Sequence, residues 1–236
     1  MTRMNFQNAL IVGAGVGLSA SLARLFAKQG WAVSLAARTP DALSGLCEET
    51  GAQAFQCDAA DEASVCELFR ALDDEGRAPD LVVYNPSARQ RAPFLELEPA
   101  RVKNAIMVTA FGGFLVAQEA AKRMVAKGSG AILFTGASAS VKGYPHSAPF
   151  AMSKFALRGL AQSMARELAP QGIHVVHFII DGGIRNPVRS GRVDGADNPD
   201  SMLCPDAVAE SYLHAATQDR SAWTWEMELR PWVEKF

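Results

Sequence analysis

The stretch at residues 9–30 constrains the fold more than any other part of the chain. It starts with a short apolar run, continues through a turn containing Gly13, Gly15 and Gly17, and ends in a segment with the periodicity of an amphipathic helix. A strand, a glycine-rich turn and a helix in direct succession are typical of nucleotide-binding α/β folds. Glycines there let a pyrophosphate approach the backbone, and the amides that open the helix near Gly17 face the anion.

The rest of the chain alternates apolar strands with helices. Candidate strands lie at 31–37, 52–56, 81–84, 131–135, 173–180 and 223–229, and candidate helices at 61–75, 99–127, 149–169 and 205–217. This alternation predicts a parallel, doubly wound sheet with helices on both faces. We expect one α/β domain over residues 1–236, with its ligands at the carboxyl ends of the strands.

Composition excludes several classes of function. The chain has 23 basic and 25 acidic residues, a net charge of −2, so nothing favours nucleic acid or an anionic membrane as a partner. Its four cysteines show no C-x-x-C spacing and its four histidines no H-E-x-x-H, so we expect reduced thiols and no metal site. No apolar run reaches spanning length, and the first strand begins too early to leave room for a signal peptide. We therefore expect a cytoplasmic location.

The ends of the second and third strands indicate which nucleotide the fold binds. A carboxylate at the end of the second strand would favour NAD, but this strand ends in Arg38, whose guanidinium suits the 2′-phosphate of NADP. Asp58, after the third strand, fits an acceptor for the adenine amino group. The alternatives are a solvated arginine at 38, and a loop acid or helix cap at 58.

The spacing of the glycine turn identifies the family that the chain resembles. Position 18 is leucine, so the dinucleotide pattern G-x-G-x-x-G fails, and G-x-x-x-G followed by Ser19 remains. This resembles the turn of short-chain dehydrogenases/reductases, with a small serine in the third glycine place. The other residues in family order are Arg38, Asp58, the segment at Asn85, residues 132–154, and residues 172–175 leading into 181–184.

The resemblance implies a Rossmann-like domain with a sheet of about seven parallel strands. It implies a nicotinamide cofactor, NADP(H) here with NAD(H) as the alternative, and a small-molecule alcohol or carbonyl substrate. It also implies a homodimer or homotetramer formed through residues 99–127 and 149–169. The residues expected to hold the cofactor are Gly13, Gly15, Val16, Gly17, Leu18, Arg38, Asp58, Ala59, Asn85, Pro86, Lys154, Gly182 and Ile184.

The proton-transfer half of the site departs from the family. Members carry Tyr-x-x-x-Lys on one helix face, where the lysine lowers the pKa of the tyrosine that moves the proton. Lys154 matches, but Phe150 stands in the tyrosine place and has no proton to give. The family serine position falls on Ala137, with Ser138 beside it, and the helix asparagine position falls on Thr109.

Replacement proton donors are found in the loop before Phe150. Tyr144 and His146 lie in that loop, and Ser138 begins it, so each is a candidate beside the expected nicotinamide. The alternative for Tyr144 is a packing or rim residue, and for His146 a solvated loop residue. Lys154, on an otherwise apolar helix face, needs a partner such as the cofactor ribose unless its stem reaches solvent.

Two segments near the end of the chain are expected to cover the site. Residues 184–204 are polar and follow the sixth strand, where family members carry a mobile substrate lid. Their arginines at 185, 189 and 192 face either an anionic substrate, a cofactor phosphate or solvent. The tail at 229–236 ends in aromatic residues that we expect to pack against a partner subunit.

Two functions fit this sequence. The first is an NADP-dependent oxidoreductase that acts on a carbonyl, an alcohol or an activated alkene with a non-standard proton donor or water. The second is a protein that binds the dinucleotide without turnover, as a sensor or structural subunit. The replacements at Phe150, Ala137 and Thr109 favour the second, whereas the remaining polar groups of the loop and lid favour the first.

Overall fold

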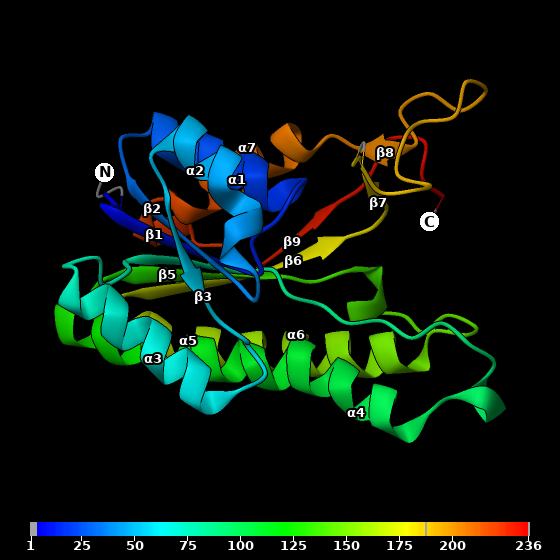
Figure 1. Cartoon of the computed structure of the whole chain (residues 1–236), viewed down its shortest axis with the longest axis horizontal. Coiled ribbons are helices and arrows are strands. Elements are labelled where there is room, and N and C mark those ends of the chain that lie inside the picture. The colour runs from blue at the N-terminus through cyan, green and yellow to red at the C-terminus, as the bar shows by residue number, and fades with distance from the viewer. Residues whose placement is uncertain (1–3, 187, 236) are drawn as a thin grey trace.

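A seven-stranded parallel sheet forms the centre of the computed structural model, which describes residues 4–186 and 188–235 (Figure 1). The order is β3-β2-β1-β4-β5-β6-β9. The strands are β1 Asn8–Val12, β2 Ala32–Ala37, β3 Gln53–Gln56, β4 Leu81–Tyr84, β5 Gly130–Thr135, β6 Ile173–Ile180 and β9 Glu226–Leu229. The predicted doubly wound α/β fold is therefore confirmed. Residues 1–3 of the predicted domain, residue 187 of the predicted lid and residue 236 of the predicted tail lie outside the described residues.

Helices cover both faces of the sheet (Figure 1). One face carries α1 Leu18–Lys28, α2 Ser44–Thr50 and α7 Pro205–Ala216, and the other carries α3 Glu62–Asp74, α4 Pro99–Ile106, α5 Gly112–Lys127 and α6 Ala148–Leu168. Side chains alternate along each strand, so Ala9 and Ile11 enter the apolar cluster under α1 while Leu10 and Val12 enter the cluster under α3 and α5. The near-continuous apolar strands follow from this burial on both faces.

The strand order reverses between β1 and β4, which fixes the position of the site. The chain runs from β1 outward to β2 and β3, then returns to place β4 on the opposite side of β1. Loops after β1 and β4 therefore diverge and leave a crevice at the carboxyl ends of the strands, where open α/β sheets bind ligands.

The predicted helix at 99–127 is interrupted by a π-helical turn, Met107–Phe111. The Tyr84 hydroxyl donates to the Val108 carbonyl at 2.5 Å, a long-range contact that the sequence did not reveal. Contrary to the prediction that no apolar run reaches spanning length, Pro99–Lys127 is long and apolar enough by length and composition alone. Because Val116 and Ala120 are fully buried in the sheet cluster, we interpret it as a core helix.

The segment predicted as a polar lid contains secondary structure of its own. Two short strands, β7 Gly183–Ile184 and β8 Met202–Leu203, pair in parallel and close its base. Beyond β7, the amide of Asn186 donates to the carbonyl of Arg192 at 2.7 Å, which closes a compact turn. The segment projects from the carboxyl edge of the main sheet (Figure 1).

Candidate functional site

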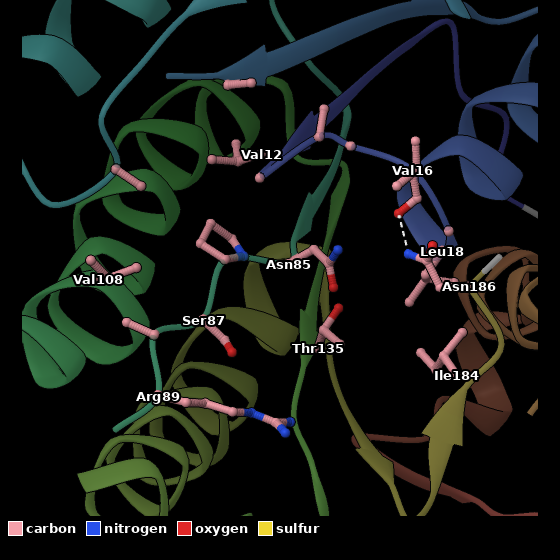
Figure 2. Close-up of a pocket in the computed structure, with 18 of the residues that line it drawn as sticks. Val12, Val16, Leu18, Asn85, Ser87, Arg89, Val108, Thr135, Ile184 and Asn186 are labelled. Atoms are coloured by element: carbon pink, nitrogen blue, oxygen red, sulfur yellow. Dashed lines mark hydrogen bonds between the residues drawn. The ribbon is translucent and has the colours of Figure 1, made fainter. Parts of the chain in front are cut away.

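A cavity of about 940 Å³ opens at the carboxyl ends of β1, β2, β4, β5 and β6. Figure 2 shows it between the glycine turn, the loop after β4 and the segment after β6. Every residue that the sequence predicts for cofactor binding lines this one cavity, and Phe150 lines it too. Within residues 4–186 and 188–235 there is no group of three His, Cys, Asp or Glu side chains that could hold a metal ion.

The glycine turn forms an open cradle. Gly13 has a φ of +77° and packs so closely on Pro86 that a Cβ would lie 2.8 Å from the proline ring, so only glycine fits there. Gly15 has open space around it, and α1 begins at Leu18 without a side-chain cap or an acidic residue in its first turn. Free amides and the helix dipole thus face the cavity, which fits a dinucleotide pyrophosphate.

Ser19 does more than replace a glycine with a small side chain. Its hydroxyl donates to the Gly13 carbonyl at 3.1 Å and accepts from Asn85 Nδ2 at 2.8 Å. It is almost fully buried. Ser19 therefore ties the glycine turn to the loop after β4, across the point where the strand order reverses.

Arg38 and Asp58 lie at the β2–β3 end of the cavity. Both side chains are exposed, and Arg38 forms no ion pair with any described residue. Asp58 Oδ1 accepts from the Ala60 amide at 3.0 Å, so this carboxylate also stabilises its own turn. The helix cap at this point is Asp61, which accepts from Ala63.

Lys154 lies at the opposite end, buried beneath the cavity. Only 2% of it is exposed, and its Nζ donates to the Thr135 carbonyl at 2.5 Å. Burial, with a smaller contribution from the Arg89 charge, lowers the pKa of Lys154 to about 7. The ammonium group consequently exchanges its proton near neutral pH.

Phe150 and Arg89 form the wall above Lys154. The Arg89 guanidinium stacks on the Phe150 ring, with 3.9 Å between Cζ and the ring centroid, and Lys154 Nζ lies 5.9 Å from the same centroid. Figure 2 shows the Arg89 side chain reaching into the cavity from the loop after β4. Part of the Arg89 side chain is exposed, but desolvation of its inner part and the charges of Arg192 and Arg189 lower its pKa to about 10, so it stays cationic at neutral pH.

Sequence reasoning missed Arg89. Its position in the sequence could have indicated a role in the site, because it lies four residues after Asn85 in a loop at the carboxyl edge of the sheet. What fixes its position is a contact between distant parts of the chain, because the Ala88 amide donates to Thr109 Oγ1 at 3.2 Å. Thr109, fully buried in the π-helical turn, thus positions the loop that carries Arg89.

The candidate proton donors of the preceding loop do not line the cavity. Tyr144 is 42% exposed, with Lys142 Nζ 5.7 Å from its ring centroid. His146 is exposed and has a φ of +61°. Ser138 begins a 3-10 turn, and the neighbouring Ala137, which does line the cavity, donates its amide to Ser140 Oγ at 3.1 Å.

Comparison with known proteins identifies extensive similarity. The short chain dehydrogenase family matches residues 7–193. D-threitol dehydrogenase of Mycolicibacterium smegmatis is 31% identical over 178 residues, which cover 73% of this chain and 68% of that protein. The crystal structure of a short-chain dehydrogenase from Rhodopseudomonas palustris is 34% identical, with a TM-score of 0.83 over 96% of this chain and 99% of that one.

A third likeness concerns the fold. The alcohol dehydrogenase of the archaeon Thermococcus sibiricus, complexed with 5-hydroxy-NADP, superposes with a TM-score of 0.84 at 23% identity, covering 97% of this chain and 98% of that one. Among three curated relatives, the match spans 62%, 73% and 68% of the relative's own length.

Proposed function

This chain belongs to the short chain dehydrogenase family of oxidoreductases, and on that premise we propose that it is an NADPH-preferring enzyme acting on a small carbonyl, alcohol or activated alkene. One observation carries the proposal: the glycine turn, Arg38, Asn85 and Lys154, which come from four separate parts of the chain, line a single cavity. A cofactor site built on these groups accounts for their convergence.

The preference for NADPH rests on Arg38. The end of β2 carries no carboxylate to bind the two ribose hydroxyls, and the Arg38 guanidinium is free to pair with a 2′-phosphate. The alcohol dehydrogenase of Thermococcus sibiricus, which has a similar fold, is complexed with 5-hydroxy-NADP, and this supports the preference.

The residues along the cavity are assigned to successive parts of the cofactor. Arg38 holds the adenosine phosphate, and the amides from Gly15 to Leu18 hold the pyrophosphate. Lys154 holds the nicotinamide ribose, with Thr135 fixing its ammonium group. The bound cofactor supplies or accepts the hydride.

Phe150 stands where the family resemblance expects the tyrosine, so the proton has to come from another group. We assign it to Lys154 or to water in the open cavity, because the ammonium pKa of about 7 matches neutral operating conditions. Ser138, Tyr144 and His146 are less suited to direct transfer, since none of them lines the cavity.

Specific contacts also support a second function, which is dinucleotide binding without turnover. Phe150, Ala137 and Thr109 all serve local structure: Phe150 packs under Arg89, Ala137 donates to Ser140 and Thr109 accepts from Ala88. A sensor or structural subunit would retain the cofactor end of the cavity and lose the proton-transfer end.

Kinetics with and without a restored tyrosine distinguish the two functions. NADPH oxidation is followed with a panel of carbonyl compounds for the wild type and Phe150→Tyr, on either side of about pH 7. The enzyme proposal predicts measurable wild-type reduction that falls as pH rises through the Lys154 pKa, because the proton-bearing form is lost. Binding of NADPH with no turnover by either protein at any pH would favour the sensor.

The quaternary and cellular parts of the proposal rest on surface features. Phe111, Phe114, Met152 and Phe155 are exposed apolar side chains on the helices predicted to form subunit contacts, which supports a homodimer or homotetramer. Residues 184–204 act as the substrate lid. The tail contributes to the subunit contact through Trp232, which is 82% exposed in the isolated subunit. All four cysteines are free, in keeping with a cytoplasmic location.

A further inference from the structure

The cavity is far more basic than the chain as a whole. Among the described residues, six basic side chains line it, against the single carboxylate of Asp58, although the chain carries a net charge of −2. The basic residues are Arg38, Arg89, Lys154, Arg185, Arg189 and Arg192. A cleft lined by one sign of charge concentrates ligands of the opposite sign.

Of these six cations only Arg185 has a carboxylate partner among the described residues. Arg185 is paired with Asp194 at 2.5 Å, but Arg89, Arg189 and Arg192 form no ion pair with any residue in 4–186 or 188–235. They also repel one another, since Arg192 and Arg189 both lower the pKa of Arg89. Like charges held together in a cleft are unfavourable unless a ligand neutralises them.

The structure holds the Arg89 and Arg192 side chains in place and fixes the backbone at Arg189. Arg89 is stacked on Phe150, and its loop is fixed through the bond between Ala88 and Thr109. The Arg192 guanidinium lies against Gly183, where a Cβ would come within 2.4 Å of it. The Arg189 amide donates to the Asn186 carbonyl at 3.2 Å, within the turn that Arg192 closes.

Their location separates them from the proposed adenosine site. Arg38 is at the end of β2, whereas Arg89 covers Phe150 and neighbours Lys154, at the end of the cavity where the reaction is proposed. Arg189 and Arg192 belong to the proposed lid, and because their charges act on Arg89 they lie near this end as well.

We propose that Arg89, Arg189 and Arg192 bind an oxyanion group of the substrate, a carboxylate or a phosphate, and that the enzyme acts on an anionic carbonyl or hydroxy compound. The planar forks of the guanidinium groups suit either oxyanion. This inference rests on the proposed function, because it assumes that the dinucleotide occupies the rest of the cavity.

Equilibrium binding to the preformed NADPH complex tests the proposal. Inorganic phosphate and malonate are each titrated into wild-type protein saturated with NADPH, at constant ionic strength maintained with sodium chloride, and binding is followed by calorimetry. The same titrations use Arg89→Gln, Arg192→Gln and the matched control Arg70→Gln, which removes an exposed arginine that does not line the cavity. Circular dichroism establishes that each variant is folded.

The proposal predicts saturable binding of at least one anion to the NADPH complex, weakened at least about tenfold by Arg89→Gln or Arg192→Gln and unchanged in Arg70→Gln. The stronger of the two probes identifies phosphate or carboxylate as the group recognised. Binding no stronger than that of chloride, or equal binding by all variants, would overturn it.

Two further results separate this inference from the proposed function. An anion that binds the free protein but not the NADPH complex would show that the arginines serve the cofactor, and would refute a substrate role. Failure of folded wild-type protein to bind NADPH would refute the proposed function itself, whereas NADPH binding without anion binding refutes only the inference.

Discussion

Replacing Lys154 with methionine should remove most of the pH dependence of stability between about pH 7 and about pH 9. In the unfolded chain this lysine keeps its proton to about pH 10, whereas burial lowers the folded pKa to about 7. The unfolded state therefore binds more protons in this interval, so wild-type stability rises with pH. Methionine fills a similar volume and carries no charge.

The magnitude follows from the linkage relation. With a folded pKa of about 7, the folded protein has released most of this proton above neutral pH, and integration gives a rise in unfolding free energy of about 2 kcal/mol across the interval. Because Lys154 is only 2% exposed, solvent screening does little to reduce this value. Cys57, whose pKa burial raises to about 11, contributes with the opposite sign but is present in both proteins.

Urea unfolding, followed by circular dichroism at both ends of the interval, measures the effect. The wild type should gain about 2 kcal/mol more than Lys154→Met as pH rises, and the variant should be the more stable protein at the lower pH. Parallel pH profiles for the two proteins would refute the assignment of a buried, proton-exchanging lysine at this position.

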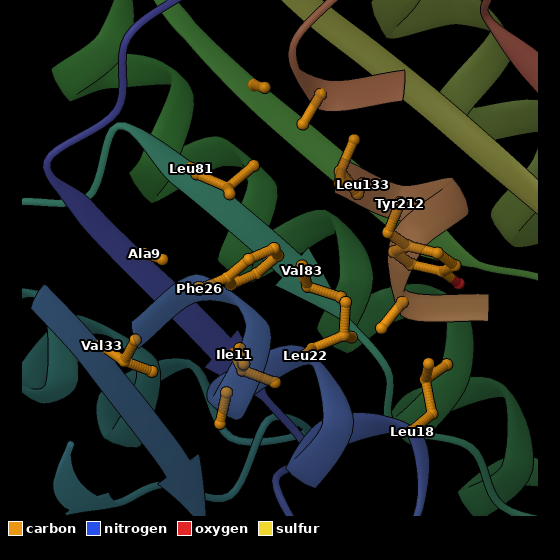
Figure 3. Packing of buried hydrophobic residues seen from close by; sticks show 14 of the residues in the cluster. Ala9, Ile11, Leu18, Leu22, Phe26, Val33, Leu81, Val83, Leu133 and Tyr212 are labelled. Carbon is orange, nitrogen blue, oxygen red and sulfur yellow. The ribbon is translucent and has the colours of Figure 1, made fainter. Parts of the chain in front are cut away.

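Two further predictions concern the core and the tail. Leu22→Ala should destabilise the protein by about 2–5 kcal/mol, because this α1 side chain is fully buried against Ile11 and Val83 (Figure 3). The control Arg24→Ala, on the exposed face of the same helix, should cost about 1 kcal/mol or less. Equal losses of unfolding free energy in urea would contradict this description of the core. Removing residues 232–236 should lower the oligomeric state measured by light scattering while leaving Pro231, which packs on Gly182, in place; an unchanged oligomer would remove the tail from the subunit contact.

The parts of the fold that depend on local sequence were predictable. Apolar periodicity and glycine spacing predict the strand, turn and helix at 9–30. Arg38 and Asp58 directly follow predicted strands. Parallel strands share one carboxyl edge, so residues that follow different strands could be predicted to meet.

Features that depend on contacts between distant segments were not predictable in the same way. The π-helical turn accepts a hydrogen bond from the Tyr84 hydroxyl, and the loop that carries Arg89 is held by a hydrogen bond to Thr109. Neither feature can be predicted from the sequence around it. The position of Tyr144 and His146 in the chain predicts that their loop lies beside the cavity. Its 3-10 turn and the left-handed backbone at His146 belong to a path that leaves both side chains exposed.

Arg38→Ala addresses the central claim, that the cavity holds a dinucleotide with its 2′-phosphate on Arg38. The fluorescence of NADPH and of NADH is titrated with wild type, Arg38→Ala and the control Arg70→Ala, each shown to be folded. The account predicts tighter binding of NADPH than of NADH by the wild type, and a loss of about 10- to 100-fold in NADPH affinity in Arg38→Ala with little change for NADH. Failure of the folded wild type to bind either nucleotide would contradict it.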